Sequence, residues 1–246
     1  MAKQEVFSRC ELFWGSDFQK ILAEKRITIV GLGGVGSFAC EALARIGIGY
    51  FTLMDFDKVS ESNINRQLFA LNSTLGQKKT LIAKQRCEDI NPNVKIEIVD
   101  SFYTQDLNKK LFENKPDFVI DAIDTMRSKT ELLDYCYQNQ IPVISSMGAG
   151  NRLTPEALRI ADLKDIKAKG CNFTKNVLRQ LRKRNITEGI PFVISDEKPA
   201  KVETVRMIEK VGDIEYEKIT PASVSFVPPV AGYIIAGHIV RSFLNE

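Results

Sequence analysis

The chain has 246 residues, of which 44% are hydrophobic and 26% charged, with a net charge of +3. These values indicate a soluble globular protein with a substantial core, no larger than one large domain. None of the five cysteines forms a Cys-x-x-Cys pair, which excludes a zinc ribbon and favours free thiols in the reducing cytoplasm. The apolar run at 224–240 contains two prolines and is marginal in length for a bilayer span, so we expect a buried helix and no membrane attachment.

Strands and helices alternate along the first 146 residues. Apolar runs predict strands at 26–30, 50–54, 94–99, 117–122 and 141–146. Helical spacing predicts helices at 35–46, 75–90 and 127–138. This alternation is typical of the α/β class, and predicts a Rossmann-like, doubly wound, mostly parallel sheet with helices on both faces.

The pattern is less regular after residue 150. Strands are expected at 157–163 and 189–195, a basic helix at 172–184, and an apolar helix from Pro229 onward. This part is too small for an independent domain and should form a small C-terminal extension of the sheet. We therefore expect a single domain over 1–246, with the nucleotide-binding part in 1–150 and the substrate and dimer side in 151–246.

A glycine-rich loop follows the first strand. Gly31, Gly33 and Gly36 match the G-x-G-x-x-G pattern, in which backbone N–H groups at a helix N-terminus approach a phosphate closely. Asp55 ends the next strand, where a carboxylate can accept hydrogen bonds from ribose hydroxyls. Because dinucleotide enzymes share both features, an NAD-dependent oxidoreductase remains an alternative at this point.

Two cations downstream favour ATP over NAD. Arg66 lies in the run Asn63-Ile64-Asn65-Arg66-Gln67, and Lys79 follows a turn. Positive charges next to a phosphate loop can neutralise the negative charge that develops on the oxygens of the attacked phosphate and on the departing pyrophosphate. Either Lys78 or Lys79 could face the phosphates. Asp124 ends a later strand at the expected carboxyl edge of the sheet, where its carboxylate could hold Mg²⁺.

These motifs occur in an order that resembles a known family. Gly-x-Gly-Gly-Val-Gly-Ser, Asp-x-Asp, Asn-x-Asn-Arg-Gln, Gly-x-x-Lys and Asp-Ala-Ile-Asp are similar to the motifs of the ubiquitin-activating-enzyme-like adenylating enzymes of the ThiF type. The resemblance implies an ATP site formed by Gly34, Asp55, Asn63, Asn65, Arg66, Lys79, Asp124 and Thr125. It also implies a homodimer in which an N-terminal arginine, here Arg9, reaches the ATP of the partner.

The chain differs from the members that activate sulfur-carrier proteins, since those usually carry two zinc-binding Cys-x-x-Cys pairs. The stretch Arg45–Gly49, the run Gly148-Ala149-Gly150 and the sequence Ser-Phe-Val-Pro-Pro resemble another branch, the tRNA threonylcarbamoyladenosine dehydratases. This implies ATP-dependent adenylation of the carboxylate of threonylcarbamoyladenosine in tRNA, followed by cyclisation. A sulfur-relay protein is a further partner compatible with the resemblance.

A basic segment supplies a surface that suits tRNA. Residues 164–184 contain eight basic residues and one acid, whereas the remainder of the chain has 26 basic and 30 acidic residues. Such a patch is typical of a polyanion-binding surface, although a solvated helix face with no ligand is an equal alternative. The expected tRNA contacts are Lys175, Arg179, Arg182, Lys183 and Arg184.

Three alternatives remain at this stage. The first is an adenylyltransferase that activates the C-terminus of a ubiquitin-like sulfur carrier. The second is the NAD-dependent oxidoreductase, which would be indifferent to loss of Arg66. The third is a non-catalytic tRNA-binding protein that retains a nucleotide site. Cys171, beside the basic helix, is expected to be an ordinary cysteine rather than a nucleophile that forms a thioester.

Overall fold

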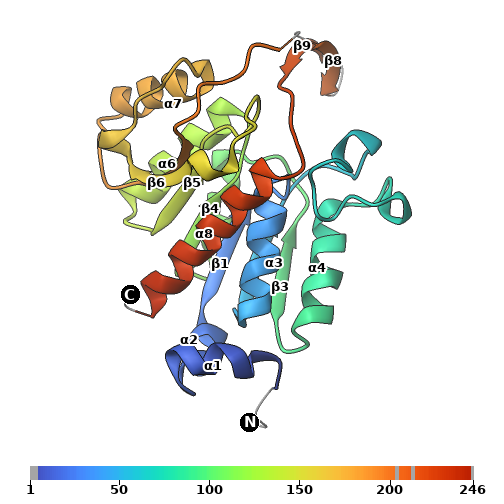
Figure 1. Cartoon of the computed structure of the whole chain (residues 1–246), viewed down its shortest axis with the longest axis vertical. Helices are drawn as coiled ribbons and strands as arrows, with labels where there is room; N and C mark the ends of the chain where they lie inside the picture. The colour runs from blue at the N-terminus through green and yellow to red at the C-terminus, as the bar shows by residue number, and fades with distance from the viewer. Residues whose placement is uncertain (1–4, 203–204, 212–213, 245–246) are drawn as a thin grey trace.

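The computed structural model describes residues 5–202, 205–211 and 214–244. Its centre is a seven-stranded sheet with the strand order β3-β2-β1-β4-β5-β7-β6 (Figure 1). Six strands are parallel, and β6 at one edge runs antiparallel to β7. The strands are β1 (Arg26–Val30), β2 (Tyr50–Met54), β3 (Lys95–Val99), β4 (Phe118–Asp121), β5 (Val143–Ser146), β6 (Leu158–Asp162) and β7 (Pro191–Ser195).

Helices cover both faces of this sheet. One core cluster joins it to α2, α3, α4 and α8, and the other joins it to α6 and α7. The helices are α1 (Ser8–Trp14), α2 (Phe18–Glu24), α3 (Gly36–Ile46), α4 (Lys79–Ile90), α5 (Asn108–Leu111), α6 (Met126–Gln138), α7 (Asn172–Lys183) and α8 (Val227–Phe243). The predicted Rossmann-like, mostly parallel fold is confirmed, and β7 and β6 form its C-terminal extension.

The structure departs from the sequence-based expectation in several places: helices α1, α2 and α5 were not predicted, and two further differences involve α4 and a β-hairpin. Helix α4 begins at Lys79 rather than at residue 75, because residues 76–78 pair with residues 58–59 across the chain. This long-range pairing outweighs the local helical pattern. The second departure is a separate two-stranded hairpin of β8 (Val205–Val211) and β9 (Ile214–Thr220), which the sequence pattern did not predict.

Helix α8 lies along α3 on one face of the sheet (Figure 1). Pro228 and Pro229 occupy its first turn, where their missing N–H groups cost no helical hydrogen bond. The predicted buried helix is therefore confirmed. Over the described ranges 5–202, 205–211 and 214–244, no helix has both the length and the hydropathy that a membrane span requires.

A buried ion pair joins β4 to α6. Lys129 Nζ lies 2.7 Å from Asp121 Oδ2, and both side chains are fully buried. Lys129 also donates to the hydroxyl of Ser145 and the carbonyl of Ser146, while the Ser145 hydroxyl donates to Asp121. Asp121 is therefore structural, since it joins β4 to β5 through Ser145 and to α6 through Lys129.

We predict that Lys129→Met destabilises the fold. The substitution leaves the Asp121 carboxylate buried without its cation, which typically costs about 3–5 kcal/mol. Urea denaturation would measure the change in the free energy of unfolding. Lys84→Met is the matched control, because Lys84 forms an exposed ion pair with Glu88, and such pairs contribute about 0–1 kcal/mol. Equal losses in the two variants would contradict the structural role of the buried pair.

Candidate nucleotide-binding site

The glycine loop connects β1 to α3 and is packed too tightly for side chains. Gly31 has φ = 95°, and a Cβ there would lie 2.7 Å from the Ala122 carbonyl oxygen. A Cβ on Gly36 would lie 1.8 Å from the carbonyl oxygen of Gly31. Because α3 starts at Gly36, the N–H groups of its first turn have no acceptors within the helix and face the end of the sheet. This is the geometry that binds phosphate.

The N-terminus of α8 supports the same loop. A Cβ on Gly34 would lie 2.9 Å from Cβ of Pro228, and one on Gly232 would lie 2.5 Å from the carbonyl oxygen of Val35. The sequence marked this proline–glycine segment as a family feature without giving it a role. The structure assigns it one, since α8 backs the phosphate loop on the side away from the sheet.

Asp55 at the end of β2 is held by two backbone donors. The N–H of Leu32 donates to Oδ2 at 2.6 Å, and the N–H of Asp57 donates to Oδ1 at 2.8 Å. Burial raises the pKa of Asp55, and the charge of Lys79 opposes that rise. An acid with a raised pKa favours the folded state when protonated, so its contribution to stability is lost as pH rises through the folded pKa. The first hydrogen bond also ties Asp55, the predicted ribose-binding residue, to the glycine loop.

Lys79, rather than Lys78, faces this acid. Its side chain is 4% exposed, and its Nζ lies 2.7 Å from Asp57 Oδ2 and 3.9 Å from Asp55 Oδ1. Lys78 points elsewhere, with its Nζ 3.2 Å from Asp100. The sequence left this choice open and did not identify Asp57 as the partner of Lys79, although the motif Asp-x-Asp contains it.

Arg66 and Asp124 lie on the other side of the glycine loop. The carbonyl oxygen of Arg66 is 3.3 Å from where a Cβ of Gly34 would stand, and its Nη1 donates to the carbonyl of Ser62 and to Oδ1 of Asn65. Partial burial lowers the pKa of Arg66, and the nearby carboxylate of Asp124 opposes this change. Asp124 is exposed at the carboxyl edge of β4. Arg66 therefore borders the glycine loop through its backbone, and its guanidinium lies close enough to Asp124 for the two charges to interact.

Asn63, Asn65 and Thr125 form hydrogen bonds that hold the segments around Arg66 and Asp124. Asn63 Oδ1 accepts the backbone N–H of Ser60, so this side chain caps its own turn. Asn65 Nδ2 donates to the carbonyl oxygen of Ser223 at 3.0 Å, which connects the arginine segment to the chain before α8. Thr125 is the N-cap residue of α6, with its hydroxyl 3.4 Å from Asp124 Oδ1.

Arg9 lies far from the glycine loop of its own chain. It is exposed on α1, and the neighbouring Phe7 packs against Gly47 at the C-terminal end of α3. Helix α3 has 11 residues and is therefore about 16 Å long, so α1 and the glycine loop lie at opposite ends of it (Figure 1). Arg9 can serve a nucleotide only if that nucleotide belongs to another copy of the chain.

The basic helix α7 is strongly amphipathic. Its buried residues recur with helical spacing, and they are Thr174, Val177, Leu178 and Leu181. The exposed basic residues on its other face are Lys175, Arg179, Arg182 and Lys183. Arg184 is only half-exposed, because its guanidinium forms an ion pair with Asp134 on α6 at 3.4 Å. The other four predicted tRNA contacts are exposed, and only Arg184 is held by this ion pair with Asp134.

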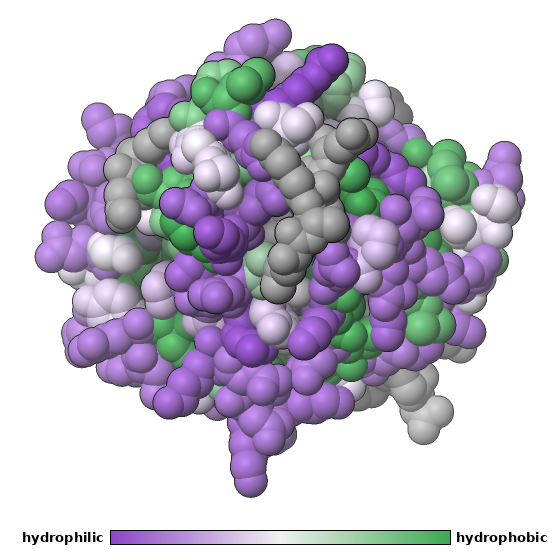
Figure 2. Space-filling view, turned by 90° about the horizontal axis from the view of Figure 1, so that it is seen from below, coloured by the Kyte–Doolittle hydropathy of each residue, from purple (hydrophilic) through white to green (hydrophobic). Residues whose placement is uncertain are grey.

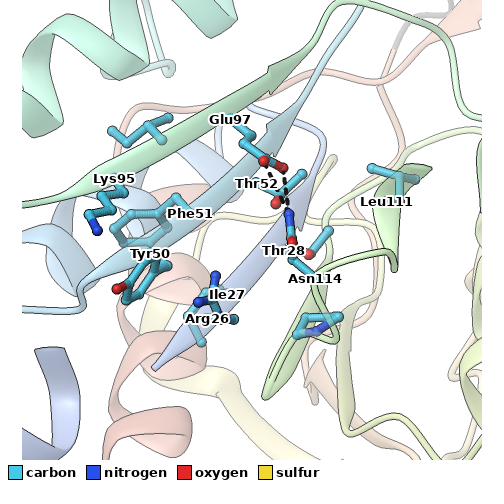
Figure 3. Close-up of a pocket in the computed structure, with 12 residues that line it drawn as sticks. Arg26, Ile27, Thr28, Tyr50, Phe51, Thr52, Lys95, Glu97, Leu111 and Asn114 are labelled. Atoms are coloured by element: carbon cyan, nitrogen blue, oxygen red, sulfur yellow. Dashed lines mark hydrogen bonds between the residues drawn. The ribbon is translucent and has the colours of Figure 1, made fainter. Parts of the chain in front are cut away.

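A separate hollow of about 250 Å³ lies at the other end of β1 (Figure 3). Arg26, Tyr50 and Lys95 are the first residues of three adjacent strands, and the guanidinium of Arg26 lies over the Tyr50 ring. None of the predicted nucleotide-binding residues lines this hollow. Among the residues that the structure describes, no group of three or more His, Cys, Asp or Glu side chains could hold a metal ion.

Comparison with known proteins agrees with this geometry. The model of the ThiF family matches residues 7–246. The chain belongs to the ThiF family. Its relatives include the tRNA threonylcarbamoyladenosine dehydratase of Bacillus subtilis, which is 42% identical over 98% of this chain and 95% of the relative. The molybdopterin-synthase adenylyltransferase of Salmonella typhimurium is 36% identical over 62% of each chain.

Solved structures of the ThiF family include a similar fold with bound nucleotide. A crystal structure of the Escherichia coli tRNA N6-threonylcarbamoyladenosine dehydratase with AMP superposes with a TM-score of 0.85, at 30% identity, over 98% of this chain and 94% of that one. The same Escherichia coli protein with ATP gives a TM-score of 0.84 at 29% identity, covering 98% and 94% of the two chains.

The orientation of the two lysines gives a direct test of the site. We expect Lys79→Met to weaken ATP binding by about 10- to 100-fold, because a charge-assisted hydrogen bond contributes about 1.5–3 kcal/mol. Lys78→Met should change it by less than about 3-fold, since Lys78 pairs with Asp100 instead. Isothermal titration calorimetry measures both, with circular dichroism as the folding control. Equal weakening by the two substitutions would contradict the assignment.

Proposed function

We propose that the chain is an ATP-dependent tRNA threonylcarbamoyladenosine dehydratase. The observation that carries the adenylation chemistry is the convergence of Arg66, Lys79, Asp55 and Asp124 on one glycine loop. Two cations beside a phosphate loop support attack at phosphorus, whereas hydride transfer to NAD has no use for them. Similarity to the Bacillus subtilis dehydratase over almost the whole of both chains supports the choice of substrate.

The reaction follows from these charges in two steps. The carboxylate of threonylcarbamoyladenosine attacks the α-phosphorus of ATP. An acyl-adenylate forms, and pyrophosphate leaves. Arg66 and Lys79 lower the barrier by neutralising charge that develops on the phosphoryl oxygens and the leaving group. A nucleophile within the same side chain then attacks the acyl carbon, AMP leaves and a ring closes. The modified nucleoside loses one water overall.

The charge balance of the site supports Mg²⁺ as the companion of ATP. Asp55, Asp57 and Asp124 carry three negative charges against the two positive charges of Arg66 and Lys79. This net negative site would repel the polyphosphate unless a cation enters with it. Mg²⁺ commonly binds through one or two carboxylates together with phosphate oxygens and water, and the exposed Asp124 is the carboxylate that fits this role.

The N-terminal helix supports a homodimer. Leu12 and Phe13 on α1 are 86% and 84% exposed, which is unusual for large apolar side chains. Apolar patches interrupt an otherwise hydrophilic surface at the end of the molecule where α1 and α2 lie (Figure 2). If a second copy covered α1 with the surface around its own glycine loop, Arg9 would lie next to the ATP of that copy, as the family resemblance implies. Sedimentation velocity tests this association.

The tRNA would lie across α7 toward the nucleotide. Phe173 in the first turn of α7 approaches Gly148, which follows β5 at the carboxyl edge of the sheet. The basic face of α7 therefore begins at the same edge as Asp124. Phosphate contacts there would position the tRNA so that its modified adenosine reaches the site. Residues 1–150 would then hold the nucleotide, and residues 151–246 the tRNA and the dimer partner, within one domain.

No cysteine thioester is required by this scheme. Cys40, Cys87 and Cys136 are buried, and burial raises the pKa of Cys136 to about 12, which keeps this thiol protonated and unreactive. Cys10 and Cys171 are partly exposed, so a sulfur-relay protein would reach one of these two. The five free thiols also fit the reducing cytoplasm.

The second candidate is activation of a ubiquitin-like sulfur carrier, which the similarity to the Salmonella adenylyltransferase supports. It uses the same adenylation step on a different carboxylate. Pyrophosphate exchange separates the two functions, because modified tRNA should stimulate exchange in the first case and a carrier protein in the second.

Mass spectrometry of nucleosides tests the primary function. After incubation with ATP and tRNA that carries threonylcarbamoyladenosine, the modified nucleoside should lose the mass of one water. Asp124→Ala should lower this conversion by at least about 100-fold, a factor typical of removing one group that stabilises a transition state. Arg127→Ala is a control, since its side chain is exposed and pairs only with Glu131 on the same helix. Loss of water without ATP, or full activity in Asp124→Ala, would contradict the proposal.

Neutralisation of the basic face tests the tRNA surface. The double variant Arg182→Gln, Lys183→Gln should weaken tRNA binding, and the slope of log K against log salt should become shallower by roughly 1–2. ATP affinity should stay the same. Lys109→Gln, Lys110→Gln on α5 removes the same charge from another exposed helix and serves as the control. An unchanged salt slope in the α7 variant would remove α7 from the tRNA surface.

A further inference from the structure

Arg152 is a buried cation without visible compensation. The residue is 4% exposed, and its Nε and Nη1 have no hydrogen-bond partner among the residues that the structure describes. A buried guanidinium that leaves donors unpaired destabilises a fold, so such groups are normally paired. The predicted site did not include Arg152, and the adenylation scheme does not use it.

The described residues around Arg152 do not supply an anion. It helps to line a pocket of about 100 Å³ whose other walls are small or uncharged residues: Asn151, Leu153, Ala200, Val202, Ala222, Ser223 and Val224. The carboxylate of Glu197, close by in the fold, is already held by the backbone N–H groups of Leu153 and Thr154. Among the side chains that the structure describes, the pocket therefore combines a positive charge with no negative one.

The walls of this pocket are built around Asn151. Its φ of 57° is in the left-handed region, and three hydrogen bonds of 2.8 Å join it to Ala200 and Ala222. Gly150 also packs closely on Pro221, because a Cβ there would lie 2.6 Å from the proline Cβ. These contacts hold two distant segments of the chain over Arg152, so the pocket is a defined feature rather than a gap between loose loops.

The pocket adjoins the nucleotide site through one shared wall residue. Ser223 lines the pocket, and its carbonyl oxygen accepts a hydrogen bond from Asn65 Nδ2 at 3.0 Å. Asn65 Oδ1 in turn accepts from Arg66 Nη1 at 2.8 Å. Arg152 follows β5, and Asp124 follows the adjacent strand β4, at the same edge of the sheet. A substrate that reaches the phosphates next to Arg66 would pass this pocket.

We propose that Arg152 binds an oxyanion of the tRNA substrate, either the carboxylate of the modified adenosine or a backbone phosphate beside it. The inference rests on the proposed function. Carboxylates and phosphates are the natural partners of an arginine, because its planar guanidinium donates several charge-assisted hydrogen bonds. Because Nε and Nη1 are themselves covered, the guanidinium would have to turn toward the pocket, where the ligand would supply the partner that these two atoms lack.

The test uses Arg152→Met in the full-length protein and two tRNA probes of the same sequence. One probe carries threonylcarbamoyladenosine and the other is an unmodified transcript. We expect a 10- to 100-fold loss of affinity for modified tRNA, as about 1.5–3 kcal/mol per charged hydrogen bond implies. An equal loss for the transcript assigns the oxyanion to a phosphate, and a loss confined to modified tRNA assigns it to the carboxylate. ATP affinity should change by less than about 2-fold.

Stability separates this binding role from a structural one. Because the charge is unpaired without substrate, Arg152→Met should melt at the same temperature as the wild type or higher. Should this variant fail to fold, which would itself count against an unpaired charge, Arg152→Lys provides the affinity comparison. Arg159→Met is the matched control, since Arg159 is exposed on β6 and pairs with Asp196.

Two results would overturn the role of Arg152 and leave the proposed function intact. One is that Arg152→Met and Arg159→Met bind tRNA with the same affinity. The other is that Arg152→Met lowers the melting temperature and leaves the affinity for tRNA unchanged. Failure of the proposed function looks different. In that case the wild-type protein itself would bind ATP without binding or dehydrating modified tRNA, and the oxyanion role of Arg152 would fall with it.

Discussion

The close approach of backbone to backbone at the glycine loop is the constraint on which the site depends. Gly36 packs on the carbonyl of Gly31, Gly31 packs on the carbonyl of Ala122, and Gly232 of α8 packs on Val35. Three elements that are distant in sequence thus meet where no Cβ fits. This contact aims the start of α3 at the end of the sheet and brings the strand before Asp124 against the same loop.

Once the loop is in place, hydrogen bonds and ion pairs distribute charge around it. Asp55 takes the N–H of Leu32 and draws Lys79 into a buried position, where Asp57 provides the shorter contact at 2.7 Å. Carboxylates of the same chain therefore neutralise Lys79. A phosphate that binds Lys79 has to compete with Asp57, which is partly exposed and able to turn toward solvent or toward a cation that enters with ATP. Such competition would exchange one ion pair for another, so the buried lysine would not be left unpaired.

Residues 151–246 contribute the elements that we propose for tRNA binding rather than for adenylation. β7 and β6 extend the sheet beyond β5, α7 presents a basic face, and the segment before α8 joins Asn65 to the pocket of Arg152. Through this segment, the wall of the Arg152 pocket and the arginine that borders the phosphate loop share a continuous set of hydrogen bonds. In the proposed function, the segment before α8 would therefore position both the residues that bind tRNA and the residues that activate its carboxylate.

The sequence by itself determined the fold class, and it marked the residues that we predict to form the nucleotide site. Strands β1 and β2 have the predicted bounds, because a buried parallel strand needs a continuous apolar run that local composition reveals. The glycine spacing, Asp55 and Arg66 were equally visible, since each follows an element whose end the pattern marks. Only tertiary structure decided between Lys78 and Lys79, because a one-residue difference at a helix start depends on the pairing of residues 76–78 with a distant segment. It also placed Arg9 away from its own glycine loop, and it buried Arg152 with Nε and Nη1 unpaired among the described residues, since burial and charge neutralisation depend on segments that meet only when the chain is folded.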